Sequence, residues 1–223
     1  MKKWLSWLRG RLGAVSEAST SCLPPVKWLG PDENPFGVEV LDCSVYATSM
    51  LSTTKDLQVA NQYSVLRTAS GEEFRGRTPQ DARKVDCSLT YPITQPPCHG
   101  PVFKSQVMED KWDIYFYDGY LYFTRSWTGD LVFRAEIQFA EEQARITLVE
   151  TSLKDDEDQF VVQQVDFLIK SYLFGLASLH PLPKSREMDP PYVLATFSFA
   201  LFGRRGLYGT FEDTLATKVM PHR

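Results

Sequence analysis

Two charged residues lie where a strand pattern calls for apolar ones, and they are the strongest candidates for chemistry. Residues 112–151 contain four runs rich in aromatic and branched side chains, WDIYFY, YLYFTRSW, LVFRAEIQF and ARITLVET, separated by turn residues. Read as neighbouring antiparallel strands, the runs place Trp112, Arg125, Phe133 and Glu150 in one row across the face expected to be buried. An unpaired buried charge is unfavourable, so Arg125 needs a partner.

Two interpretations of Arg125 follow. In the structural one, Arg125 stacks on Trp112 and pairs with Glu150, which lies roughly 10 Å away at the backbone if adjacent strands are about 5 Å apart. In the functional one, Arg125 lines a cleft with Trp112, Trp127 and Glu150 and binds an anionic ligand. The sequence favours the structural pair and leaves the ligand site as the alternative.

A second group of cations lies in the sequence Gly203-Arg204-Arg205-Gly206. Backbone amides beside the glycines, together with the guanidinium groups of Arg204 and Arg205, could hold a phosphate. The same residues fit a surface loop that ends the preceding helix at Gly203. The sequence favours the loop.

Motifs for catalysis are absent from the sequence. It contains no GxSxG, HExxH, P-loop or GxGxxG pattern. A Cys98/His99/Asp110 arrangement is conceivable, but adjacent residues in a chain point apart. We therefore name no catalytic residue, and the sequence leans toward a protein that is not an enzyme.

The cysteines give no metal site. Cys22, Cys43, Cys87 and Cys98 form no CxxC pair, so nothing resembles a zinc framework. We expect no metal and no cofactor. Without a convincing signal peptide, the cysteines are interpreted as reduced thiols in a cytoplasmic protein.

The charge distribution bears on the kind of partner. Residues 1–30 contain five basic residues and one acidic residue, a net charge of +4. Because the whole chain has a net charge of −4, the remaining residues carry −8. An acidic body argues against nucleic acid, because phosphate contacts need clustered Lys and Arg. No apolar run approaches the roughly 20 residues that a transmembrane helix needs.

The N-terminal residues 1–34 are predicted to be an amphipathic helix followed by a linker, and residues 35–223 a single α+β domain. In the sequence MKKWLSWLRGRL, apolar residues recur at helical spacing with basic residues between them. Such a helix could make weak contact with a membrane surface or a partner. The alternative, which we favour, is a helix docked on its own domain or a frayed terminus.

Turn lengths predict the register of the four central strands. Asp118-Gly119 suits a two-residue type I′ turn, because both residues need positive φ. A three-residue loop over residues 128–130 and a four-residue loop over residues 140–143 keep the apolar residues on one face. The resulting pairs are Trp112 with Arg125, Arg125 with Phe133, Phe123 with Ala135, Phe133 with Glu150, Ala135 with Leu148, and Ile137 with Ile146.

Four tyrosines share the opposite face of this sheet: Tyr115, Tyr117, Tyr120 and Tyr122. If this face is open, it is a surface suited to binding another protein. If a second helical layer covers it, each hydroxyl group needs a hydrogen-bond partner. The sequence does not decide between the two.

The predicted fold class is α+β, with a mainly antiparallel sheet of five to seven strands. A long helix over residues 156–179, capped by Asp155, is expected to pack on the apolar face of the 112–151 meander. Further elements are predicted as helices over Lys55–Thr68 and Tyr192–Phe202, and strands over Gly37–Val45, Val85–Tyr91 and Val102–Met108. A strand is the alternative for Tyr192–Phe202, because this run is apolar all round.

The run LYFTRSWTG at residues 121–129 resembles a segment of small uncharacterised bacterial proteins in which an aromatic strand ends in R-S-W-T-G before a hairpin loop. The resemblance covers roughly thirty residues around Trp112–Phe133. It implies a bacterial, cytoplasmic protein and brings no activity or site.

These observations favour a non-catalytic protein-binding or accessory module of a bacterial system, an immunity-like protein being one form, with another protein as partner. The alternative is a domain that binds a small anionic molecule, or a hydrolase, using the Arg125 end of the sheet. An open tyrosine face would support the first function, and a closed pocket at Arg125 the second.

Overall fold

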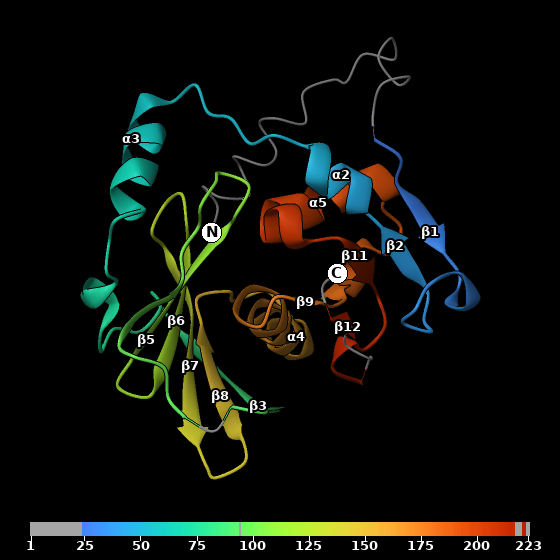
Figure 1. Cartoon of the computed structure of the whole chain (residues 1–223). Helices are drawn as coiled ribbons and strands as arrows, with labels where there is room; N and C mark the ends of the chain where they lie inside the picture. Colours follow the sequence, from blue (N-terminus) through green and yellow to red (C-terminus); the bar gives the residue numbers. More distant parts are fainter. Residues whose placement is uncertain (1–23, 94, 217–219, 222–223) are drawn as a thin grey trace.

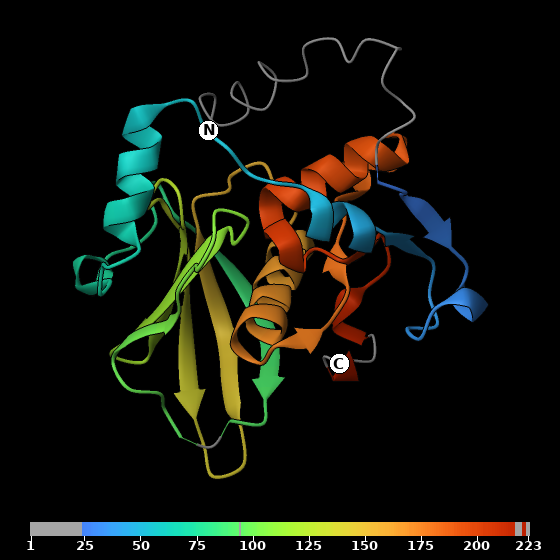
Figure 2. The ribbon, with the colours of Figure 1, turned by 45° about the horizontal axis from the view of Figure 1, so that its top comes forward.

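Two β-sheets on either side of one central helix define the architecture (Figures 1 and 2). A computed structural model describes residues 24–93, 95–216 and 220–221. Over these ranges the chain is α+β, as predicted, and no helix in them is both long and apolar enough to cross a membrane. The predicted N-terminal helix lies outside the described residues.

The larger sheet has six antiparallel strands in the order β3-β8-β7-β6-β5-β4. The prediction of a four-strand meander within a sheet of five to seven strands is thus confirmed. The strands are β3 (Arg83–Tyr91), β4 (Gly100–Phe103), β5 (Trp112–Tyr117), β6 (Tyr120–Arg125), β7 (Leu131–Phe139) and β8 (Ala144–Thr151).

The hairpin of β5 and β6 has the predicted register. Asp118 and Gly119 both have positive φ, 50° and 79°, as a type I′ turn requires. Trp112 lies opposite Arg125. The local turn chemistry therefore determines this pairing.

The register of β6 and β7 differs from the prediction by two residues. Phe123 lies opposite Phe133 and not Ala135, and Arg125 is not opposite Phe133. The loop is longer than three residues, because the amide of Arg125 donates to the carbonyl of Asp130 (2.9 Å) and the ladder has an irregularity after Phe123. The even shift keeps Phe133 and Ala135 on their predicted face, whereas the irregularity turns Leu131 to the tyrosine face, where it packs against the buried tyrosines.

A β-bulge changes the pairing of β7 and β8. Ile137 pairs with Ile146 as predicted, but the register shifts between Glu136 and Ile137, and Arg134 then lies opposite Glu150. The predicted pairs Ala135–Leu148 and Phe133–Glu150 are therefore wrong. A bulge adds one residue to one strand, and its consequence here is that Glu150 belongs to the tyrosine face.

Helix α4 (Asp158–Leu168) packs on the apolar face of this sheet, as predicted, and continues as the π-helical turn η4 (Ile169–Leu173). The helix is shorter than the predicted 156–179, because Gly175 adopts positive φ (63°). Glu157, not Asp155, occupies the N-cap position.

The smaller sheet combines strands from distant parts of the chain in the order β1-β2-β11-β10. Its strands are β1 (Lys27–Leu29), β2 (Val40–Asp42), β10 (His180–Pro181) and β11 (Tyr208–Thr210). Strand β1 lies within the predicted linker, and β2 is shorter than the predicted strand 37–45. The two-residue strands β9 (Leu176–Ala177) and β12 (Met220–Pro221) pair separately.

Three further helices complete the described part of the fold. Helix α5 (Pro191–Phe202) lies beside the smaller sheet and agrees with the predicted helix over 192–202; α2 (Ser44–Ser49) packs against it. Helix α3 (Leu57–Leu66), predicted as 55–68, stands beside the end of the larger sheet that carries the β6–β7 loop, where Gln62 donates to the carbonyl of Thr128 (2.7 Å; Figure 2). Its N-cap is Asp56, whose carboxylate accepts from the amide of Gln58 (2.8 Å).

Candidate functional site

Arg125 binds the end of helix α5. Its guanidinium group donates to the carbonyl oxygens of Ala200 (2.7 Å) and Leu201 (3.1 Å), which the last turn of a helix leaves without intrahelical partners. The guanidinium also lies 4.7 Å from the ring centre of Trp112, so the predicted stacking is present. Burial lowers the pKa of Arg125 to about 10. The side chain therefore joins the sheet to α5.

The predicted ion pair between Arg125 and Glu150 is wrong. The bulge in β8, between Ile146 and Leu148, brings Glu150 opposite Arg134, whose Nε lies 2.5 Å from Oε2 of Glu150. The guanidinium of Arg134 also lies 4.6 Å from the ring centre of Tyr120. Glu150 is consequently on the opposite face from Arg125 and is no part of a site there.

The tyrosine face is covered, which decides between the two alternatives left open by the sequence. Tyr115, Tyr117 and Tyr122 are buried, and Tyr120 is half-buried. Phe74 packs on them from the segment that contains the short helix η3 (Glu72–Phe74). The three buried tyrosines are thus unavailable to a protein partner.

Each buried hydroxyl group on this face has a polar partner. Tyr117 donates to the carbonyl of Ser70 (3.0 Å), Lys104 donates to the hydroxyl of Tyr115 (2.8 Å), and the amide of Gly76 donates to the hydroxyl of Tyr122 (3.0 Å). These bonds offset the cost of burying the phenol groups.

Arg204 and Arg205 both bind groups within the protein. Arg204 pairs with the buried carboxylate of Asp110 through two contacts, Nε to Oδ1 at 2.7 Å and Nη2 to Oδ2 at 3.2 Å. Arg205 donates to the carbonyl of Ser171 (2.6 Å) and lies 4.8 Å from the ring centre of Tyr172. They fit the loop interpretation better than a phosphate site.

A second set of groups at this end of the sheet was not found from the sequence. Lys111, immediately before β5, donates to the hydroxyl oxygen of Ser52 (2.5 Å) and to the carbonyl of Met108 (3.0 Å). Its Nζ lies 4.8 Å from the ring centre of Trp127 and 4.9 Å from that of Phe199. Ser52 and Lys111 are far apart in the sequence, and no local motif joins them.

Burial weakens the preference of Lys111 for its charged form. The residue is only 7% exposed. Burial lowers its pKa to about 7, and the positive charge of Arg125 adds to this effect, whereas Glu109 and Asp110 oppose it. An amine in this state can accept a proton near neutral pH.

Gly203 allows the end of α5 to approach the strand that carries Lys111. The glycine has φ 58°, and a Cβ atom there would lie 1.7 Å from the carbonyl oxygen of Glu109 and 3.0 Å from Cγ of Lys111. The amide of Arg204 donates to the same carbonyl (3.2 Å). The predicted helix end at Gly203 is therefore also a close backbone crossing.

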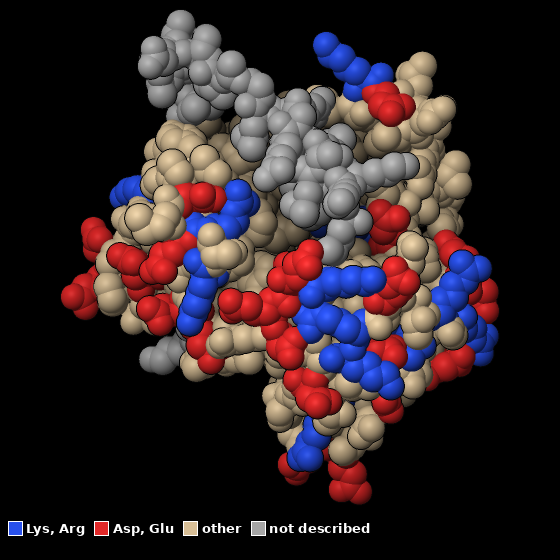
Figure 3. Space-filling model, turned by 180° about the vertical axis from the view of Figure 1, so that it is seen from behind, with Lys and Arg blue, Asp and Glu red and all other residues tan. Residues whose placement is uncertain are grey.

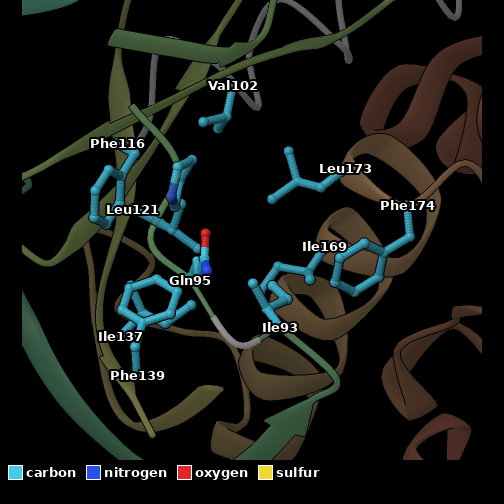
Figure 4. Close-up of a pocket in the computed structure, with 11 residues that line it drawn as sticks. Ile93, Gln95, Val102, Phe116, Leu121, Ile137, Phe139, Ile169, Leu173 and Phe174 are labelled. Atoms are coloured by element: carbon cyan, nitrogen blue, oxygen red, sulfur yellow. The ribbon is translucent and has the colours of Figure 1, made fainter. Parts of the chain in front are cut away.

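An apolar cavity of about 300 Å³ lies between the larger sheet and the helix that packs on it. It is at the end of the sheet near the Asp118-Gly119 turn, away from Arg125. Figure 4 shows Ile169, Leu173 and Phe174 on the helical side, opposite the aromatic and aliphatic side chains of the sheet. The sheet and the segment before β4 supply Ile93, Gln95, Pro97, Val102, Phe116, Leu121, Ile137 and Phe139.

The remaining candidate groups do not form a catalytic site. His99 lies 3.8 Å from Asp118, whereas Asp110 pairs with Arg204, so the conceivable Cys98/His99/Asp110 arrangement is not assembled. Among the described residues, no group of three or more His, Cys, Asp or Glu could hold a metal ion. Acidic and basic side chains are intermixed on the face shown in Figure 3.

His180 is a buried structural residue. Its Nε2 lies 2.7 Å from the hydroxyl of Ser198, and its ring packs against Phe167 and Phe202. Burial lowers its pKa to about 3, so it stays neutral at ordinary pH. Both His180 and Ser198 are fully buried, which leaves no access for a substrate.

Comparison of the chain with protein-family models, with curated proteins and with solved structures gave no match. The two candidate sites are therefore the apolar cavity and the group around Lys111, and each is defined by geometry alone.

Proposed function

We propose that the protein is a small-molecule-binding module that takes an apolar ligand into the cavity between β5–β7 and α4–η4. The observation that carries this proposal is the cavity of about 300 Å³ beside the main core, lined almost entirely by aliphatic and aromatic side chains. Ligand pockets of small molecules are concave, mostly apolar and of this size or larger. Apolar surface left without contacts is unfavourable, and a ligand would supply them.

The lining restricts the chemistry of the ligand. Among the described lining residues, only Gln95 has polar side-chain atoms, an amide group that can both donate and accept hydrogen bonds. An ionised group in this cavity would lose its hydration without gaining a counter-charge. The ligand class is therefore a neutral ring or branched aliphatic molecule with one polar group, and the anionic ligand considered from the sequence does not fit here.

The preference for a protein-binding module loses its main structural basis. It rested on the absence of catalytic motifs and on the acidic, aromatic-rich body, and an open tyrosine face would have supported it, but three of these four tyrosines are buried. The accessory or immunity-like role in a bacterial system stays a prediction. A ligand-binding module can serve such a role, but no contact in the structure supports a particular partner.

The test is a titration of the full chain with N-phenyl-1-naphthylamine, a neutral apolar fluorophore that brightens when water is excluded. We expect saturable binding to the wild type. Leu173→Trp, which fills the cavity from the helical side, should weaken binding at least tenfold. The matched control is Ser88→Trp, because Ser88 is exposed on β3 and is not among the lining residues.

Equal binding by Leu173→Trp and the wild type would refute the proposal, as would fluorescence that does not saturate. Circular dichroism and the unfolding midpoint of each variant distinguish lost binding from lost folding. Phe139→Ala provides a second variant: by enlarging the cavity it should retain or strengthen binding of the bulky probe.

A further inference from the structure

We propose that Ser52 is a nucleophile activated by Lys111, and that the two form a serine–lysine pair able to accept an acyl group from a small ester. This activity is independent of the apolar cavity, which lies at the other end of the sheet. The pair is defined by the 2.5 Å contact between Nζ of Lys111 and Oγ of Ser52.

The contacts of Lys111 orient its amine toward Ser52. The carbonyl of Met108 accepts one hydrogen bond, and the rings of Trp127 and Phe199 lie on the amine at 4.8 and 4.9 Å. In the neutral amine, a hydrogen bond to Met108 leaves the lone pair able to accept from the hydroxyl of Ser52. A positioned base of this kind is what a serine nucleophile needs.

The linker that carries Ser52 is also positioned. Ser52 lies between α2 and α3, and its amide donates to Oε1 of Glu109 (2.7 Å). Ser52 is half-buried, whereas the preceding residue, Leu51, is 78% exposed. Ser52 is therefore partly accessible to solvent, whereas Lys111 is buried.

The charged groups that face Lys111 come from two directions. Glu109 and Asp110 belong to its own segment, and Asp110 is in turn bound by Arg204 from the end of α5. Arg125 approaches from β6, and Phe199 of α5 presents an uncharged ring. The pKa of about 7 is consistent with an amine that is largely neutral above that pH.

The chemistry balances with these two residues and water. Lys111 takes the hydroxyl proton of Ser52 as Oγ forms a bond to the ester carbonyl carbon. Collapse of the tetrahedral intermediate breaks the bond to the alkoxide leaving group, which receives the proton from Lys111. Water then attacks the acyl-serine, Lys111 accepts its proton and returns it to Oγ, and a carboxylic acid leaves.

The position of Ser52 restricts the substrate class. The carboxylate of Glu109 lies at the amide of Ser52, so an anionic acyl group would be repelled. The surface linker favours a short, uncharged acyl group. These features point to small neutral esters such as p-nitrophenyl acetate.

The test is covalent labelling of the full chain with a fluorophosphonate, followed by peptide mapping by mass spectrometry. We expect labelling at Ser52, with a rate that rises with pH, reaches half its maximum near pH 7 and levels off above it. Lys111→Met should lower the rate at pH 8 by at least ~100-fold, the contribution typical of a general base. Lys111→Arg should not restore it, because arginine stays protonated.

Ser88, exposed on β3, is the internal control for unactivated serine. The proposal would be overturned if Ser52 were labelled no faster than Ser88. It would also be overturned if Ser52 were labelled at the same rate in Lys111→Met as in the wild type. The wild-type pH profile makes the test independent of how well that variant folds. Labelling should be unchanged in Leu173→Trp, so this proposal and the apolar-ligand proposal can fail separately.

Discussion

Arg134 on β7 faces Glu150 on β8, with Nε of the arginine 2.5 Å from Oε2 of the glutamate. Glu150 is only 8% exposed, so the two charges neutralise each other in a largely dry environment. Arg134→Met should lower the free energy of unfolding by about 3 kcal/mol, because it leaves a buried carboxylate unpaired. Adding Glu150→Gln should recover part of that loss, and urea denaturation of the two single variants and the double variant measures the coupling.

The control for this pair is Arg125. Arg125→Met and Glu150→Gln act on opposite faces of the sheet, so their effects should add to within about 0.5 kcal/mol. Strong coupling between these two substitutions would contradict the register given by the bulge.

Arg125 itself is expected to stabilise the contact between the sheet and α5. Arg125→Met removes the donors to Ala200 and Leu201, and each hydrogen bond from a charged donor contributes about 1.5 to 3 kcal/mol. We therefore expect a loss of about 3 kcal/mol and little rescue by Arg125→Lys, which cannot reproduce the planar fork. Thermal unfolding checks both variants. An unchanged midpoint for Arg125→Met would show that the contact contributes nothing.

Gly203 is expected to tolerate no side chain. Gly203→Ala would place Cβ 1.7 Å from the carbonyl oxygen of Glu109, at a φ of 58°, so the end of α5 would have to move. The expected loss of stability is about 3 kcal/mol or more. Gly37 provides a matched control, because its φ is also positive (74°) but nothing lies within 4 Å of a Cβ there.

Gly37→Ala should cost only about 1 kcal/mol, the backbone component of the same change. Urea denaturation of the two alanine variants compares them directly. Similar losses in the two would show that the crossing at Glu109 is less tight than the structure indicates.

His180 should make stability depend on pH. Burial lowers its pKa from 6.5 to about 3, so between these values the unfolded chain binds more protons than the folded one. The stabilisation is complete above pH 6.5 and is lost as the pH falls toward 3. At pH 5 the loss from this residue is about 2 kcal/mol, since one pKa unit corresponds to about 1.4 kcal/mol.

The measurement for His180 is urea denaturation of the wild type and His180→Gln at pH 7 and pH 5. Other titrating groups contribute equally to both proteins, so the wild type should lose about 2 kcal/mol more than the variant. An identical loss in the two proteins would mean that His180 is protonated in the folded state.

The features that could be predicted from the sequence depend on neighbouring residues. The Asp118-Gly119 turn fixed the β5–β6 register because both residues must adopt positive φ, a property of the pair itself. The bulge between Ile146 and Leu148 of β8 could not be predicted in this way. The alternation of apolar and polar residues continues on either side of the extra residue, and packing selects its position. Gly175 was a signal in the sequence for the end of the helix, but the apolar period continuing to Leu176 obscured it.

The candidate sites depend on contacts between distant segments. Ser52 and Lys111 come from two connecting segments far apart in the sequence, and no motif around either residue indicates a partner. The apolar cavity results from how closely a helix packs on a sheet, which the pattern of apolar residues does not specify. Conversely, Arg125 was correctly placed opposite Trp112, whereas its predicted neighbour Phe133 and its predicted partner Glu150 were wrong.

The smaller sheet has a consequence for how the protein is made. Strand β2 pairs with β1, which precedes it closely, and with β11, which follows all six strands of the larger sheet. As synthesis proceeds from the N-terminus, the larger sheet can form while one edge of β2 still has no neighbour. Such an edge invites pairing with another nascent chain until β11 emerges from the ribosome. Ribosomes that stall before residue 208 would therefore present an aggregation-prone intermediate, and chaperone demand should peak in that interval of translation.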